Sequence, residues 1–183
     1  MRVTVKDIRH YPWFLKPFFW NQKRKYGRVL LPGLIWGRVP RLFSAVAILY
    51  GALDRKKSPL HPVLRSLVAV RVSQINSCRF CVDINSNILA ARAGSMAKVE
   101  ALARWRDSEL FSDMEKAVLD YTDSVTFSDR QVTDRQVEGL HQYLNEDGIV
   151  ELTGLIAFQN MSSKFNSALD TPPQGFCKVS GES

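Results

Sequence analysis

Apolar residues recur three and four positions apart through most of the chain, which is the spacing that places them on one face of an α-helix. The clearest stripe consists of Leu64, Leu67, Val68, Val72 and Ile75. The same period continues after a short break, at Phe80, Ile84, Ile88, Leu89 and Ala91. Because no segment alternates apolar and polar residues convincingly, as strands do, the sequence predicts an all-α fold.

Proline, glycine and serine mark the ends of several predicted helices. Pro40 suits a first helical turn, and the apolar stripe behind it predicts a helix that ends near Asp54. Gly94 is expected to stop the helix that follows the break, and Ser95 to cap the next one.

Two capping boxes predict further helices in the second half of the chain. They are Ser-Asp-Met-Glu at residues 112–115 and Thr-Asp-Arg-Gln at residues 133–136. The last helix should run from about Asp147 to Leu169, and its wide apolar surface predicts burial on more than one side.

Residues 10–36 form an extension that is rich in aromatic and basic residues and is interrupted by Pro12 and Pro17. A soluble monomer would not leave so many aromatic side chains in water. One interpretation is a membrane-surface anchor with a basic flank. We favour an arm packed over its own domain or across a subunit boundary, because aromatic residues broken up by proline make a poor amphipathic helix.

A length of 183 residues with 45% hydrophobic residues is enough for one well-buried domain. We expect an extension with the first helices at residues 1–58 and one compact helical unit at residues 59–183. The longest apolar run, Leu42 to Leu53, is too short to span a bilayer, so no stable membrane insertion is expected.

The net charge of +7 is unevenly distributed. Residues 1–60 hold 13 Lys and Arg against only Asp7 and Asp54, whereas the rest of the chain is slightly acidic. No groove-reading motif accompanies the basic residues, so we expect no nucleic-acid partner. Solubility or docking to an acidic partner explains the charge more simply.

Cys78 and Cys81 form a Cys-x-x-Cys motif at the start of a predicted helix. The free N–H groups and the positive dipole end of a helix start favour an anion such as a thiolate. With Arg79 beside them, these cysteines are expected to have a lowered pKa and to lie within reach of a disulfide bond.

Other roles for the cysteines remain open. Zinc would need two more ligands, and Cys177 and three scattered histidines offer no second paired spacing, so we expect no metal. The pair could also be small buried hydrophobic residues, inert despite the motif. Cys177 could form a mixed or intermolecular disulfide, although a simple unpaired thiol explains it as well. An odd number of cysteines without a visible leader favours the reducing cytoplasm.

The run from Leu64 to Asp83 resembles the signature of the carboxymuconolactone decarboxylase superfamily, in its alkylhydroperoxidase D-like, cysteine-containing branch. The resemblance continues at residues 151–153, 159–160, 165–169 and 172–176. It implies a helical bundle without a bound cofactor that forms a homo-oligomer, a trimer or a hexamer.

The resemblance also implies roles for the two cysteines. The residue matching Cys81 attacks a peroxide and becomes a sulfenic acid, the residue matching Cys78 closes the disulfide, and a cellular dithiol restores both. The helix-dipole argument alone would instead make Cys78 the thiol with the lower pKa.

Peroxidases of this family use a glutamate and a histidine as a proton relay, and their positions hold Ser66 and Asn85 here. Neither side chain accepts a proton near neutral pH, although Glu100 or Glu151 could replace them. We therefore expect a thiol–disulfide oxidoreductase or peroxidase-like antioxidant enzyme, with a peroxide or disulfide substrate and a peroxide turnover limited by the missing relay. The alternatives are a non-catalytic assembly or binding protein and, with less support, a lactone decarboxylase.

Overall fold

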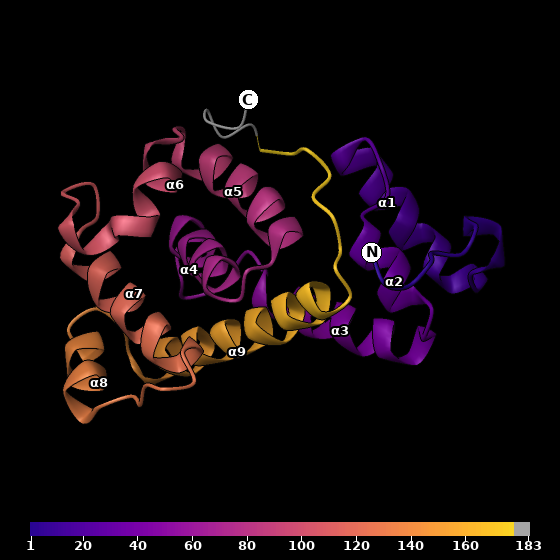
Figure 1. Ribbon diagram of the computed structural model, residues 1–183. Coiled ribbons are helices and arrows are strands. Elements are labelled where there is room, and N and C mark those ends of the chain that lie inside the picture. Colours follow the sequence, from indigo (N-terminus) through magenta and orange to yellow (C-terminus); the bar gives the residue numbers. More distant parts are fainter. Residues whose placement is uncertain (178–183) are drawn as a thin grey trace.

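The computed structural model describes residues 1–177, which form an all-helical chain without strands (Figure 1). The α-helices of this part are α1 (Lys16–Tyr26), α2 (Leu31–Gly37), α3 (Pro40–Leu53), α4 (Pro62–Ile75), α5 (Arg79–Ala93), α6 (Ala97–Ala101), α7 (Asp113–Thr126), α8 (Asp134–His141) and α9 (Glu146–Ala168). Short 3-10 helices occur at Ile8–His10, Trp13–Leu15 and Leu102–Asp107. The all-α prediction is therefore confirmed.

Helix α4 lies at the centre of the bundle, with α5, α7 and α9 packed around it (Figure 1). Leu64, Val68 and Val72 recur every fourth residue and join α9 in one apolar cluster. Leu67 and Val70 belong to a second cluster, which includes residues of α5 and α7. Burial of each such side chain stabilises the fold by about 1.5–3 kcal/mol. Helix α4 therefore connects the two main clusters of the core.

Both predicted capping boxes are present. The Ser112 hydroxyl accepts a hydrogen bond from the Glu115 N–H, and the Glu115 carboxylate accepts one from the Ser112 N–H. Thr133 and Gln136 make the same pair of bonds at the start of α8. These reciprocal bonds satisfy N–H groups that a helix start would otherwise leave unpaired.

The segment after α5 differs in part from its prediction. Gly94 ends α5 with φ of +71°, as its position predicted. The Ser95 hydroxyl accepts a hydrogen bond from the Ala97 N–H, but α6 ends after five residues. A 3-10 helix follows, with Arg104 in a non-helical conformation, so the single helix expected here is two short pieces.

The aromatic extension forms α1 and α2 and packs over its own chain. Tyr11, Phe19 and Trp36 are buried in an aromatic cluster with residues of α3. The Trp36 ring stacks on Phe165 of α9, with ring centroids 3.5 Å apart. By contrast, Trp13 is 79% exposed, so some aromatic side chains of the extension do face water. None of the helices between residues 1 and 177 is both long and apolar enough to cross a bilayer.

A buried carboxylate joins α4, α7 and the 3-10 helix after α6. The Asp123 side chain is 0% exposed and accepts two hydrogen bonds from Arg71, at 2.6 and 2.9 Å. Arg106 donates a third bond at 3.0 Å. A buried charge needs such partners, because it loses its hydration on burial and only ion pairs and hydrogen bonds offset that loss.

The segment after α9 returns along α5 and separates it from α1 and α2 (Figure 1). The Asp83 carboxylate of α5 holds this segment by accepting the backbone N–H groups of Gln174, Phe176 and Cys177, at 2.7 to 2.8 Å. The Gln174 side chain accepts the Leu31 N–H at 2.9 Å. The segment therefore joins the extension to the helix that carries the cysteines.

Candidate active site

Cys78 and Cys81 lie at the turn between α4 and α5 and are joined by a disulfide bond. Cys78 is the N-cap of α5, and its Sγ accepts a hydrogen bond from the Cys81 N–H at 3.2 Å. Only 1% of Cys78 and 3% of Cys81 is exposed. The helix-start position and the disulfide reach predicted from the sequence are both confirmed. The helix start favours a thiolate in the reduced form.

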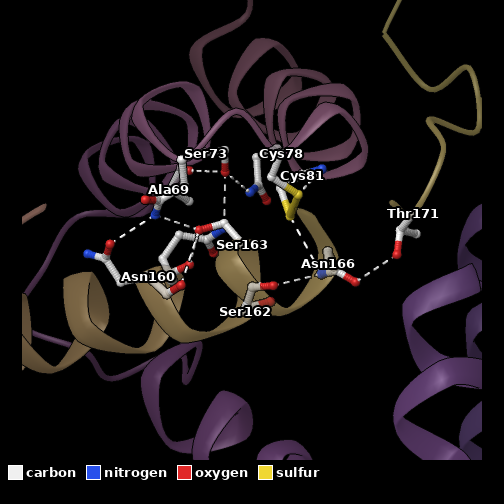
Figure 2. The surroundings of a disulfide bond; sticks show 12 residues. Ala69, Ser73, Cys78, Cys81, Asn160, Ser162, Ser163, Asn166 and Thr171 are labelled. Atoms are coloured by element: carbon white, nitrogen blue, oxygen red, sulfur yellow. Dashed lines mark hydrogen bonds between the residues drawn. A yellow bond between two sulfur atoms is a disulfide. The ribbon is translucent and has the colours of Figure 1, made fainter. Parts of the chain in front are cut away.

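Hydrogen bonds fix the turn against α9. The Asn76 side chain donates to Asn160 Oδ1 at 2.9 Å and to Ser163 Oγ at 2.8 Å. The Asn166 amide donates to Cys81 Sγ, with an N···S distance of 3.6 Å (Figure 2). Helix α9 therefore supports the cysteine turn and places an amide donor on one of its sulfurs.

Asn85, one helical turn beyond Cys81, belongs to a network centred on Ser73. The Ser73 hydroxyl donates to the Ala69 carbonyl at 2.6 Å (Figure 2). It accepts bonds from Asn85 at 3.2 Å and from Gln159 at 3.0 Å. The Asn85 amide thus acts as a donor here. It positions the serine but offers no base.

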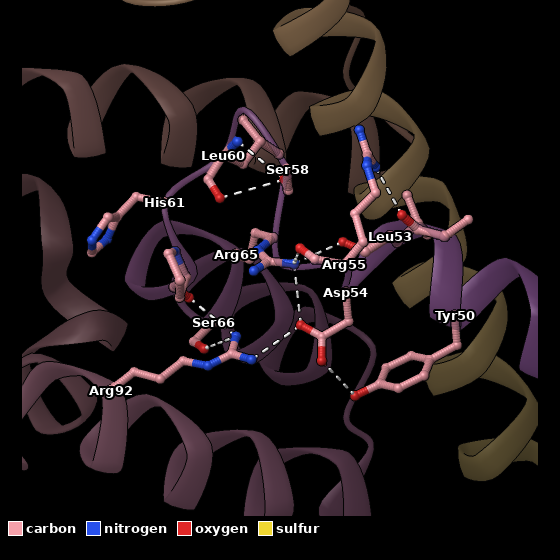
Figure 3. A network of polar contacts seen from close by, with 12 residues as sticks. Tyr50, Leu53, Asp54, Arg55, Ser58, Leu60, His61, Arg65, Ser66 and Arg92 are labelled. Carbon is pink, nitrogen blue, oxygen red and sulfur yellow. Dashed lines mark hydrogen bonds and ion pairs between the residues drawn. The ribbon is translucent and has the colours of Figure 1, made fainter.

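Ser66 lies in a different network, together with a carboxylate that the sequence analysis did not select. The buried Ser66 hydroxyl accepts a hydrogen bond from Arg92 at 3.0 Å (Figure 3). Arg92 also pairs with Asp54 at 3.0 Å, and Arg65 approaches the same carboxylate oxygen at 3.2 Å. Asp54 follows the last residue of α3 and brings an acidic group next to position 66.

The second oxygen of Asp54 accepts a hydrogen bond from the Tyr50 hydroxyl at 3.4 Å (Figure 3). Desolvation of the hydroxyl, and then the negative charge of Asp54, raise the pKa of Tyr50 above its ordinary value. The phenol therefore stays protonated around neutral pH and is a hydrogen-bond donor.

A cavity of about 250 Å³ opens beside the cysteine pair. Its wall includes Cys81 but not Cys78, and Asn85, Tyr50 and Asp54 contribute to the same wall. A smaller cavity of about 60 Å³, lined in part by Ser66, shares these last three residues with it. Cys81 therefore faces the same space as the Tyr50 and Asp54 pair.

The chain resembles known proteins both in sequence and in fold. The model of the carboxymuconolactone decarboxylase family matches residues 40–124. The uncharacterized protein YnjA of Escherichia coli strain K12 is 45% identical over 177 residues, which cover 97% of both chains. An uncharacterized peroxidase-related protein of Ralstonia eutropha with an alkylhydroperoxidase AhpD core superposes with a TM-score of 0.88, at 20% identity and over 96% of this chain and 93% of that one. This chain contains a carboxymuconolactone decarboxylase family domain and has an alkylhydroperoxidase D-like fold.

The alkylhydroperoxidase D-like fold also occurs in a protein with a different chemistry. The debrominase Bmp8 in complex with 2,3,4-tribromopyrrole superposes with a TM-score of 0.84, at 22% identity and over 96% of this chain and 93% of that one. At this identity the likeness concerns the fold alone.

Within this alkylhydroperoxidase D-like chain, the two replacement bases considered from the sequence lie elsewhere. Glu151 pairs with Arg55 and Ser58, and Glu100 is exposed on α6. Neither belongs to the wall of the cavity beside Cys81. Asp54 is one of only two acidic residues among the first sixty. Its closeness to Ser66 depends on tertiary packing, so the sequence does not predict it.

Two further expectations concern metal and the third cysteine. Between residues 1 and 177, no group of three or more His, Cys, Asp and Glu side chains could hold a metal ion.

Cys177 is a free, half-buried thiol. Burial, and then the charges of Asp83 and Glu100, raise the pKa of Cys177, so its thiolate fraction is low.

Proposed function

We propose that this protein is a thiol–disulfide oxidoreductase that takes electrons from a cellular dithiol and passes them to a peroxide or disulfide. The observation that carries the proposal is that Cys81 faces the cavity, while its disulfide partner Cys78 lies behind it at the helix start. In this arrangement Cys81 meets the substrate and Cys78 resolves the intermediate. A cytoplasmic location would supply the dithiol.

With a hydroperoxide, the Cys81 thiolate attacks the outer oxygen and the O–O bond breaks. Cys81 becomes a sulfenic acid, and the leaving alkoxide takes up a proton and departs as an alcohol. The Cys78 thiolate then attacks the Cys81 sulfur, and hydroxide leaves and is protonated to water. A dithiol reduces the resulting disulfide and is itself oxidised, which closes the cycle.

We assign the proton transfer to Tyr50 and Asp54. Their position on the cavity wall supports this role, as does the proximity of Asp54 to Ser66, where the family's peroxidases have a glutamate. In the resting site the single phenol O–H donates to Asp54. During the reaction it turns to the leaving oxygen and transfers its proton, and water then restores the proton. Asn85 positions Ser73 and takes no proton.

Trapping the intermediate tests the two cysteine roles. The reduced Cys78→Ser variant should accumulate a sulfenic acid at Cys81 after addition of a hydroperoxide, detectable as a dimedone adduct by mass spectrometry. The Cys81→Ser variant should give no adduct at Cys78. An adduct at Cys78 alone would reverse the roles, and the absence of oxidation in both variants and in the wild type would refute the proposal.

A second candidate function is reductive dehalogenation of an aromatic compound. The aromatic wall of the cavity beside Cys81 favours it, and a debrominase shares the fold. In this reaction two thiols become a disulfide while the carbon–halogen bond is replaced by carbon–hydrogen and halide is released. Bromide release from 2,3,4-tribromopyrrole by the reduced protein would support it.

A non-catalytic assembly or binding role is the remaining alternative. It requires that the cysteines have no part in the measured function. A function that survives replacement of both Cys78 and Cys81 by serine would favour that role over the redox proposal.

A further inference from the structure

The cavity beside Cys81 is built from two parts of the chain. Nine of its 23 lining residues come from residues 18–36, ahead of residue 40, where the match to the family model begins. Most of the others belong to α3, α5 and α9. The extension therefore completes a wall that the cysteine helices leave open.

We propose that this cavity binds a small molecule that contains an aromatic ring and that the extension selects it. The proposal rests on the redox function of the pair and names its substrate class. Seven aromatic side chains line the cavity: Phe18, Tyr26, Trp36, Phe43, Tyr50, Phe80 and Phe158. Aromatic rings pair in offset-stacked or edge-to-face arrangements, and such pairs contribute more than the burial of their area alone.

The cavity is larger than hydrogen peroxide needs. Water occupies roughly 30 Å³ per molecule in the liquid, so hydrogen peroxide would leave most of the 250 Å³ unfilled. Pockets for drug-sized ligands start at roughly 300 Å³. The space therefore fits a compound of one or two rings.

The polar groups of the wall define how such a compound is oriented. Cys81 and Asn166 contribute to the α5 and α9 side, while Tyr50 and Asp54 come from the end of α3. The Tyr50 hydroxyl donates to the polar end of the ligand, and its reactive atom meets Cys81. For an aromatic hydroperoxide the reaction is the one written above, with an aromatic alcohol as product.

Two pairs of variants test whether the cavity itself, and not the surface around it, selects the substrate. Each pair combines a change in the cavity wall with a matched change at an exposed position. Ala47 of α3 lines the cavity, whereas Ala52 of the same helix is exposed and does not. Ala47→Leu fills the space, and Ala52→Leu is the matched control. Phe18→Ala removes a ring of the extension from the wall, and Phe14→Ala removes an exposed ring nearby.

The first measurement compares the rates at which cumene hydroperoxide and hydrogen peroxide oxidise the reduced pair. The wild type and Ala52→Leu should react faster with cumene hydroperoxide. Ala47→Leu should lose about tenfold of that rate and less of its rate with hydrogen peroxide, so the ratio of the two rates falls. Its helical circular dichroism shows whether the variant is folded. Phe18→Ala should reduce the preference for cumene hydroperoxide, and Phe14→Ala should keep it.

The second measurement is binding of 2-phenyl-2-propanol, the product alcohol, to the disulfide form by NMR titration. The wild type and both controls should bind it, and Ala47→Leu and Phe18→Ala should bind it more weakly. Binding without any oxidation of the reduced pair by a peroxide or a disulfide would refute the proposed function and leave the binding of an aromatic ligand standing. Equal rates with both peroxides and no binding would overturn this inference while the redox function remained.

Discussion

Asp54 and Arg92 form an ion pair with a 3.0 Å separation beside the Ser66 hydroxyl. Arg92 thereby links Asp54, at the end of α3, to Ser66 of α4 in one network of polar contacts. The Tyr50 hydroxyl donates a hydrogen bond to the same carboxylate, and both residues line the cavity that Cys81 also lines.

Replacing Tyr50 by phenylalanine should slow oxidation of the cysteine pair by hydroperoxides. Loss of a general acid costs roughly 10²-fold or more in rate. The measurement is stopped-flow oxidation of the reduced protein, followed by the loss of two thiols. Reduction of the disulfide by a small dithiol serves as the control, since it needs no proton for an alkoxide. An unchanged peroxide rate would remove Tyr50 from the mechanism.

Tyr50 should also affect stability at alkaline pH. Its pKa is raised in the folded chain, whereas an unfolded phenol loses its proton near pH 10. Above pH 10 the unfolded state therefore binds fewer protons than the folded state, and the free energy of unfolding falls as the pH rises. Urea unfolding at several pH values should show a smaller fall for Tyr50→Phe than for the wild type. Identical slopes would contradict the raised pKa.

Removal of the buried carboxylate at position 123 should destabilise the fold strongly. Asp123→Ala leaves Arg71 and Arg106 without their shared partner, which costs about 3–5 kcal/mol for a buried pair. Asp120→Ala is the matched control, because Asp120 pairs with Arg106 at the surface, and it should cost about 1 kcal/mol or less. Chemical denaturation measures both. Equal losses would show that burial does not decide the effect.

The oligomer that the family resemblance implies stays a prediction. Ile48 of α3 is 74% exposed and Val150 of α9 is 71% exposed, which a single chain in water does not favour. Sedimentation velocity should find an assembly for the wild type and a smaller species for Ile48→Glu. A wild type that sediments as a monomer at all concentrations would contradict it.

The helical class and the cysteine turn could be predicted because they depend on local signals. Capping boxes at Ser112 and Thr133 and the glycine stop at Gly94 act within one helical turn. The Cys-x-x-Cys motif likewise places its two sulfurs within one turn. These signals need no knowledge of the rest of the chain.

The composition of the cavity could not be predicted, because it depends on contacts between distant segments. Trp36 reaches its place by stacking on Phe165, more than a hundred residues away. In the sequence Asp54 is only the charged end of an apolar helix, and its place beside Ser66 depends on its ion pairs with Arg65 of α4 and Arg92 of α5. The division into residues 1–58 and 59–183 stays a prediction, and α3, which it places in the extension, lies within the family match.

A redox titration tests the central claim most directly. The protein is equilibrated in dithiol and disulfide buffers of different potential, and its free thiols are counted, with Cys78→Ser and Cys81→Ser as controls. The account predicts that the wild type loses two thiols together in one reversible two-electron step, and that either substitution abolishes the step. If both thiols instead stay reduced and unreactive across the cellular range of potentials, the cysteine pair is not a redox centre and the account is wrong.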